Sequence, residues 1–170
     1  AIQFEKQGGE FVLGFEEALG YSAGPVAKDK VGLSTAMLIA DLASDLKRKG
    51  RTLWDALNEV RLLFGYTLSM QHSIKRPGIQ GANEIEMMMG NLRDDQPLVI
   101  ANSKVIRHLA ILNSYEITPT EHGEMRRTLK LPKSNVLIYH LENGDRVVVR
   151  PSGTEPKIKF YFEVKLALPS

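Results

Sequence analysis

Two runs of alternating residues near the end of the chain restrict its fold more than any other feature. Residues 146–150 read Arg-Val-Val-Val-Arg, and residues 158–164 alternate apolar side chains with Lys159, Tyr161 and Glu163. A period of two indicates strands. Because only a short stretch separates the two runs, we predict two strands joined by a loop.

The connecting stretch, from Arg150 to Lys157, reads Arg-Pro-Ser-Gly-Thr-Glu-Pro-Lys. Gly153 lets the backbone turn where a side chain would clash. Ser152 and Thr154 supply hydroxyls, and neighbouring N–H groups in such a turn can converge on an anion. Arg150 offers a planar fork for two phosphate oxygens, and Lys157 adds a mobile charge. These residues indicate a phosphate site, but the composition is equally typical of an ordinary hairpin loop.

This eight-residue sequence closely resembles the phosphate-binding loop in the last domain of the α-D-phosphohexomutases, the family of the phosphoglucomutases and phosphomannomutases. The resemblance implies that Arg150, Ser152, Gly153 and Thr154 bind the phosphate that does not react. Lys157 assists them.

A second stretch, residues 14–21, follows an expected short buried strand at 11–13 and reads Gly-Phe-Glu-Glu-Ala-Leu-Gly-Tyr. Taken alone, Glu16 and Glu17 suit sugar hydroxyls, but a solvated loop is the commoner use of such residues. The stretch resembles the sugar-recognition loop in the third domain of the same family, most of all in its phosphoglucomutase/phosphopentomutase branch. The resemblance implies that Glu16 and Glu17 bind substrate, whereas Ala18 replaces a Ser and removes one contact.

The charged segment 28–32 reads Lys-Asp-Lys-Val-Gly. It resembles a family element in which a Lys, here Lys30, reaches the substrate. Val31 departs from the usual Asp of that element, and a solvated charged turn is an equally good interpretation.

Two amphipathic helices are predicted in the first half of the chain. Residues 33–49 carry apolar residues at three- and four-residue spacing and end in Lys47, Arg48, Lys49 and Gly50. We interpret this basic run as complementing the helix dipole rather than as a nucleic-acid patch. The second helix starts at Thr52, with Asp55 completing a capping box.

The second half reads as strands with one helix, and we place a domain boundary between residues 66 and 67. Asn83 is expected to cap a helix whose methionines fill the core. The remaining elements are strands at 104–112, 125–131 and 135–141, a connecting loop at 113–123, and a hairpin about Asn143-Gly144.

The predicted fold class is therefore mixed α+β. In terms of the resemblance, residues 1–66 are a truncated α/β third domain. Residues 67–170 are then the fourth domain, a TATA-binding-protein-like antiparallel sheet packed with helix.

Composition excludes several function classes. The 170 residues include no cysteine, so neither a disulfide framework nor a thiolate zinc site is available. The net charge of +2 is too small to indicate nucleic acid, and no apolar run is long enough to span a membrane. The four histidines, His72, His108, His122 and His140, lack metal-ligand spacing. A cytoplasmic protein is the default expectation.

The resemblance implies the C-terminal fragment of a phosphoglucomutase, truncated at both ends. Family members convert glucose 1-phosphate to glucose 6-phosphate through glucose 1,6-bisphosphate, using a phosphoserine in the first domain and Mg²⁺ held by the second. Neither the phosphoserine nor the metal ligands lie in this chain. We therefore expect the fragment to contribute no catalytic residue, to need the missing N-terminal domains and to be inactive alone.

Other readings stay open. The substrate can be that of a phosphomannomutase or a phosphopentomutase, and the chain can be a module that binds sugar phosphates without turnover. A nucleic-acid-binding domain is a further alternative, because a small sheet with helices and a basic loop can serve that role. Glu163 among the outward residues of the last strand argues against it.

Overall fold

The computed structural model describes residues 8–16, 20–24 and 31–166. The chain divides into two compact units, Ala1–Leu63 and Phe64–Ser170. We predicted a boundary between residues 66 and 67, three residues further along the chain.

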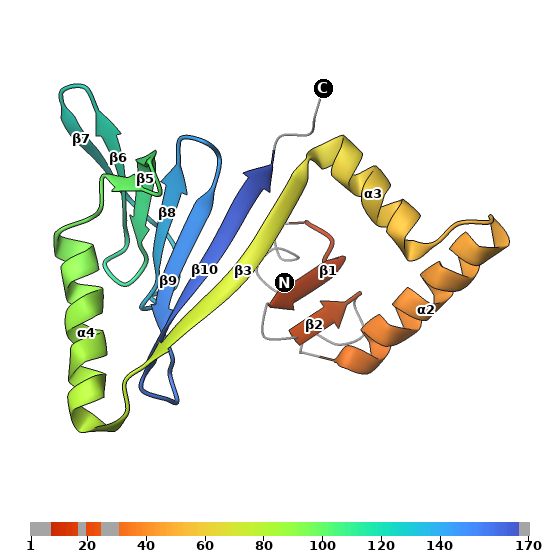
Figure 1. Cartoon of the computed structure of the whole chain (residues 1–170), viewed down its shortest axis with the longest axis horizontal. Coiled ribbons are helices and arrows are strands. Elements are labelled where there is room, and N and C mark those ends of the chain that lie inside the picture. The colour runs from red at the N-terminus through yellow and green to blue at the C-terminus, as the bar shows by residue number, and fades with distance from the viewer. Residues whose placement is uncertain (1–7, 17–19, 25–30, 167–170) are drawn as a thin grey trace. The chain divides into compact units, whose positions relative to one another are not determined.

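The first unit contains a two-stranded antiparallel ribbon followed by two helices (Figure 1). Its elements are β1 (Leu13–Glu16), β2 (Gly20–Ala23), α2 (Gly32–Arg48) and α3 (Leu53–Phe64). Both predicted helices are confirmed. The capping box is also confirmed, because the Thr52 N–H donates to Asp55 Oδ2 at 2.7 Å and the Asp55 N–H donates to Thr52 Oγ1 at 3.2 Å.

The prediction of a buried strand at residues 11–13 is wrong. β1 begins only at Leu13, and Val12 and Leu13 are 71% and 56% exposed. Ala23 and Leu46 are the only buried apolar residues among those described in this unit. Within the ribbon, Leu13 and Phe15 of β1 are exposed, whereas Ala23 of β2 is buried.

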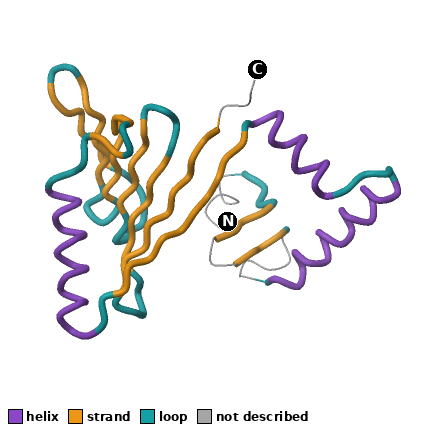
Figure 2. The backbone as a smooth tube through the Cα atoms, in the orientation of Figure 1, coloured by secondary structure: helices purple, strands orange, loops and turns teal. Residues whose placement is uncertain are grey.

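The second unit is an eight-stranded sheet with one described helix (Figures 1 and 2). Its strands pair antiparallel in the order β3-β10-β9-β8-β5-β6-β7, and β4 pairs with β5. The elements are β3 (Tyr66–Lys75), α4 (Gly78–Asp94), β4 (Val99–Ile100), β5 (Ser103–Ala110), β6 (Tyr115–Thr120), β7 (Gly123–Thr128), β8 (Leu137–Leu141), β9 (Arg146–Pro151) and β10 (Lys157–Leu166). The mixed α+β class is confirmed.

The core of this unit lies between α4 and one face of the sheet, the helix face. Ile85 and Met89 of α4 pack against alternate residues of the strands, among them Leu137, Val149 and Ile158. Because side chains alternate along a strand, the residues between these point to the opposite face, here called the open face. No described helix of the second unit covers the open face.

Two predictions in this unit are wrong. The stretch 113–123 is not a loop throughout, because β6 pairs with β7 from Tyr115 to Thr120. We predicted a loop because the stretch contains Pro119, and proline lacks the N–H that donates a hydrogen bond to a neighbouring strand. β5 pairs with β6 only as far as Ile117, so Pro119 has a strand neighbour on one side alone and its missing donor is tolerated there.

The helix that we expected to start at Asn83 starts at Gly78, with Pro77 as its N-cap residue. The residues before Asn83 include Pro77, Gly78 and Gly81, and proline and glycine are poor helix formers. Tertiary packing overrides this propensity. Gly81 is buried, and the backbone of Arg76 lies directly against it.

Candidate phosphate-binding loop

The loop between β9 and β10 is closed by its own backbone. The Ser152 N–H donates to the carbonyl of Lys157 at 2.8 Å, and the Lys157 N–H donates to the carbonyl of Glu155 at 2.7 Å. The Thr154 N–H lies 3.5 Å from Ser152 Oγ. The predicted strand–loop–strand arrangement is confirmed, and the loop is a compact turn.

The steric reason given for Gly153 is wrong. Its φ does not lie in the left-handed region, and a Cβ placed on it would have nothing within 4 Å. The glycine therefore leaves open space rather than relieving a clash. Among the described residues, the N–H groups of Gly153 and Glu155 donate no hydrogen bond. They remain available to an anion.

The two cations predicted for the site share the open face. Val149 and Ile158 are buried on the helix face, so their neighbours Arg150 and Lys157 point to the opposite side. Arg150 is exposed, and no ion pair to it is formed within the described part of the chain. The structure thus brings a guanidinium and an ammonium to one side of the loop.

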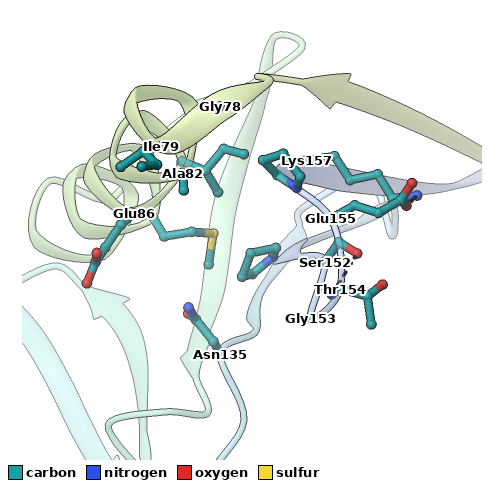
Figure 3. Close-up of a pocket in the computed structure, with 14 residues that line it drawn as sticks. Gly78, Ile79, Ala82, Glu86, Asn135, Ser152, Gly153, Thr154, Glu155 and Lys157 are labelled. Carbon is teal, nitrogen blue, oxygen red and sulfur yellow. Dashed lines mark hydrogen bonds and ion pairs between the residues drawn. The ribbon is translucent and has the colours of Figure 1, made fainter.

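Glu155 was not among the residues predicted for the site, and its carboxylate forms an ion pair with the Lys157 ammonium. Figure 3 shows the two charged groups meeting on the side of the loop away from α4. The hydrogen bond from Lys157 is the main reason that the pKa of the Glu155 carboxyl lies below its ordinary value.

Two further cations on the open face were also missed. Lys159 pairs directly with Arg150 across β10 and β9, and Lys75 pairs directly with Lys157 across β3 and β10. Directly paired residues of antiparallel strands point to the same face. The alternation of 158–164 already placed Lys159 outward, but the pairing with Lys75 joins segments more than eighty residues apart, which periodicity does not reveal.

A pocket of about 640 Å³ lies between the loop and α4, and on the loop side it is lined by Ser152, Gly153, Thr154, Glu155 and Lys157 (Figure 3). Ile79, Ala82 and Met89 form its apolar wall, and Glu86 and Asn135 add polar groups. Arg150 does not line it. The N–H of Arg76 donates to the carbonyl of Pro156 at 2.9 Å and ties this side of the loop to the end of β3.

The substrate residues predicted in the first unit are described only in part. Glu16 is the last residue of β1, pairs with Gly20 and is exposed. Glu17 and Lys30 lie outside the described residues.

The histidines and carboxylates form no metal centre in the described part of the chain, where no group of three or more such side chains is placed to hold an ion. His108 is buried at 1% exposure and stacks on Tyr139, with ring centroids 4.8 Å apart. No described helix is long and apolar enough to cross a membrane.

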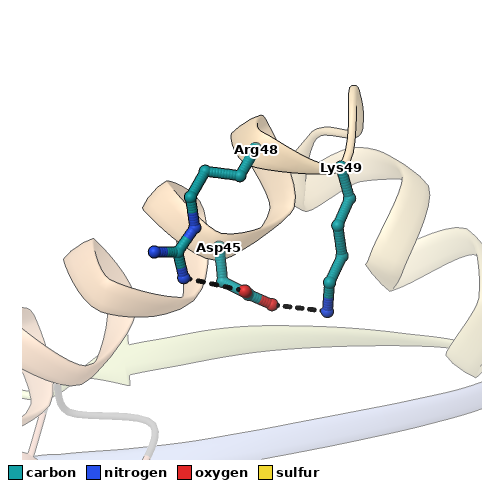
Figure 4. Close-up of polar contacts among 3 residues, drawn as sticks. All are labelled: Asp45, Arg48 and Lys49. Atoms are coloured by element: carbon teal, nitrogen blue, oxygen red, sulfur yellow. Dashed lines mark hydrogen bonds and ion pairs between the residues drawn. The ribbon is translucent and has the colours of Figure 1, made fainter.

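The basic run at the end of α2 is compensated locally (Figure 4). Asp45 accepts from Arg48 at 3.0 Å and from Lys49 at 2.7 Å, and its pKa is lowered chiefly by the hydrogen bond from Lys49. The run lies in the last turn, as a complement to the helix dipole should. Two of its three charges therefore have an acidic partner on the same helix.

Comparisons with known proteins show which family the chain resembles. Residues 101–167 match the family described as phosphoglucomutase/phosphomannomutase, C-terminal domain. The chain is 39% identical over 155 residues to a probable phosphomannomutase of Haemophilus influenzae, a match that covers 91% of this chain and 28% of that protein. It is 34% identical over 158 residues to a phosphoglucomutase of Staphylococcus haemolyticus, covering 92% of this chain and 28% of that protein.

Among solved structures, the fold is similar to parafusin, a phosphoglucomutase from Paramecium. The TM-score is 0.55 at 17% sequence identity, over 89% of this chain and 25% of that one. At this identity the likeness shows the fold alone. The chain spans about 28% of the length of the curated relatives described above.

Proposed function

Because the chain belongs to the phosphoglucomutase/phosphomannomutase family, we propose that it is the C-terminal part of a phosphoglucomutase. The complete enzyme interconverts glucose 1-phosphate and glucose 6-phosphate through glucose 1,6-bisphosphate. The observation that carries the proposal is the placement of Arg150 and Lys157 on one side of a compact loop whose N–H groups include free donors. Phosphomannomutase or phosphopentomutase activity is the alternative within the family.

In this proposal the loop holds the phosphate that does not react. Arg150 binds two phosphate oxygens through its planar fork, and Lys157 adds an ammonium. Ser152, Gly153 and Thr154 contribute hydroxyls and backbone N–H groups. Phosphoryl transfer depends largely on positioning and charge stabilisation, so a group that anchors the far end of the substrate contributes to rate without touching the reacting atoms.

Glu16, Glu17 and Lys30 are assigned to the sugar in the same proposal. Carboxylates accept hydrogen bonds from hydroxyls, and Glu16 is exposed at the end of β1, where a ligand can reach it. We assign residues 1–66 to the third domain of the family and residues 67–170 to the fourth.

The catalytic phosphoserine and the Mg²⁺ site belong to the rest of the enzyme. The described residues do not fit a metal, since they form no suitable cluster of histidines and carboxylates. We therefore propose that the 170-residue chain binds phosphosugar but is inactive alone. Turnover of glucose 1-phosphate by the purified chain would refute this inactivity.

The first unit exposes apolar surface that another part of the same polypeptide can cover. Its helices expose large apolar side chains along much of their length, including Leu33, Met37, Leu42, Leu62 and Leu63. Contiguous exposed apolar surface marks an interaction site. We propose that the remainder of the enzyme, which accounts for most of the relatives' length, covers these helices.

An amide-shift titration with glucose 6-phosphate tests the binding role. Isotopically labelled chain should show saturable shifts at Ser152, Gly153 and Thr154, and these shifts should disappear in Arg150→Ala. Arg127→Ala is the matched control, because Arg127 lies opposite Glu116 on the open face, close to the other edge of the sheet. Loop shifts that persist in Arg150→Ala, or no shifts at millimolar ligand, would contradict the assignment.

A further inference from the structure

The open face carries excess positive charge at the end that adjoins the loop. Arg150, Lys159, Lys157 and Lys75 lie on three neighbouring strands. Two of the direct cross-strand pairs, Arg150 with Lys159 and Lys157 with Lys75, join like charges. Like charges placed directly opposite each other destabilise a sheet. Like-charge pairs that are kept in spite of this cost indicate a site that binds an anion.

The rest of the same face differs. Four residues before Arg150, Arg146 forms an ion pair with Glu163, its direct cross-strand partner. Arg146 is thus neutralised within the sheet. Near the loop, the Glu155 carboxylate forms an ion pair with Lys157, and within the described part of the chain no ion pair to Arg150, Lys75 or Lys159 is formed.

The Glu155 carboxylate lies within reach of the charges of three of these cations, the lysines. It accepts from Lys157, which is only 19% exposed, whereas Glu155 itself is 53% exposed. The pKa of the carboxyl is lowered first by the hydrogen bond from Lys157, then by its charge, and to a smaller extent by the charges of Lys75 and Lys159. All three lysines therefore act on one carboxylate that reaches solvent.

We propose that the Glu155 carboxylate competes with the phosphate for the same cations and occupies their site when no phosphate is bound. Lys75 and Lys159 complete the cation cluster that binds the phosphate once it displaces Glu155. This inference rests on the proposed phosphate-binding role of the loop. A phosphate monoester dianion offers three acceptor oxygens and more charge than one carboxylate, so it can engage more of the cluster. An exposed ion pair such as that of Glu155 contributes little stability, so it can be displaced.

The test measures the affinity of the 170-residue chain for inorganic phosphate and for glucose 6-phosphate, by amide shifts at constant ionic strength. Glu155→Gln keeps the side-chain shape and removes the competing charge, so we expect about two- to fivefold tighter binding of both probes. Glu163→Gln is the matched control, because Glu163 also pairs with a cation on the open face but away from the loop. It should leave the affinity unchanged.

The two added lysines are tested by Lys75→Gln and Lys159→Gln, each expected to weaken binding about two- to fivefold. Lys165→Gln, on the open face near the far end of β10, should not weaken it. Unchanged or weaker binding in Glu155→Gln, or no effect of either lysine, would overturn the inference.

The outcomes separate the two proposals. Binding that is lost in Arg150→Ala but insensitive to Glu155→Gln keeps the phosphate-binding role and refutes competition by Glu155. Binding of phosphate by the Glu155→Gln variant alone supports both the phosphate-binding role of the loop and the competition by Glu155. Absence of saturable loop shifts in every variant refutes both.

Discussion

The carbonyl oxygen of Arg76 lies 1.9 Å from the point that a Cβ on Gly81 would occupy. The same residue donates its N–H to the carbonyl of Pro156, at the end of the loop between β9 and β10. The backbone of Arg76 is thus held between α4 and the loop, and only glycine at position 81 leaves room for it.

Gly81→Ala should therefore destabilise the protein by about 2–3 kcal/mol, because the Cβ forces backbone atoms apart rather than a flexible side-chain end. Chemical denaturation measures the change, and amide shifts should extend to Glu155 and Lys157, the neighbours of Pro156. Gly90→Ala in the same helix is the control. Nothing lies within 4 Å of its Cβ position, so it should gain about 0.5–1 kcal/mol from helix propensity. Equal effects of the two substitutions would contradict the steric account.

His108 should make the protein less stable as the pH falls. Burial is the main cause that lowers its pKa from the ordinary 6.5 to about 4, and the charge of Arg93 lowers it further. Between these values the unfolded chain binds a proton that the folded chain does not, so the free energy of unfolding decreases as the pH falls from about 6.5 towards 4. The full loss is about 3 kcal/mol.

His108→Phe keeps a ring to stack on Tyr139 and cannot titrate. Its stability, measured by urea unfolding from pH 7 to pH 4, should lack this component. The exposed His122 provides the control, because His122→Ala should retain the pH dependence of the unsubstituted chain. An identical pH profile in His108→Phe would refute the role of this residue.

Met89 should contribute far more to stability than Met87. Met89 is 1% exposed and lies in the core beneath α4, whereas Met87 is 60% exposed on the same helix. Met89→Ala should cost about 2–5 kcal/mol through lost burial and the cavity left behind. Met87→Ala should change stability by less than about 0.5 kcal/mol. Denaturant midpoints at a common slope would measure both, and similar values would contradict the packing.

Asp145 should anchor the far end of β10. Its Oδ1 accepts the N–H of Lys165 at 2.8 Å, and its own N–H donates to Asn143 Oδ1 at 3.1 Å. Asp145→Ala removes a charged acceptor and should cost about 1–2 kcal/mol. It should also speed hydrogen exchange at Lys165. Glu142→Ala, in the same turn, removes a side chain that forms no hydrogen bond with the described residues and should have little effect.

The sequence predicted the elements whose signals are local. Alternation located β9 and β10, helical spacing located α2, and Thr52 with Asp55 marked the start of α3. The phosphate-site prediction could be made from sequence because the residues assigned to it are contiguous, and it stays a prediction. The grouping of the four cations could not be predicted, because Lys75 comes close to the loop only through the pairing of β3 with β10.

The misses share a physical cause. Pro119 and Gly81 have poor intrinsic propensity for the elements that contain them, and the structure accepts each because of a neighbour distant in sequence. Pro119 lies beyond the reach of β5, and Gly81 makes room for Arg76. Glu155 was not assigned a role from the sequence, because a carboxylate does not match the charge of a predicted anion site. Its ion pair with Lys157 is visible only in the structure.

The pairing of β3 with β10 also dictates an order of folding. β3 opens the second unit and has β10 as its only neighbour in the described sheet, from Tyr66 opposite Leu166 to Lys75 opposite Lys157. Long sequence separation makes such a contact slow to form, because a large loop must close first. During synthesis β3 is made early and stays unpaired until β10, the last strand described, has left the ribosome. The cation cluster, which draws on both strands, is therefore assembled only when the sheet is complete.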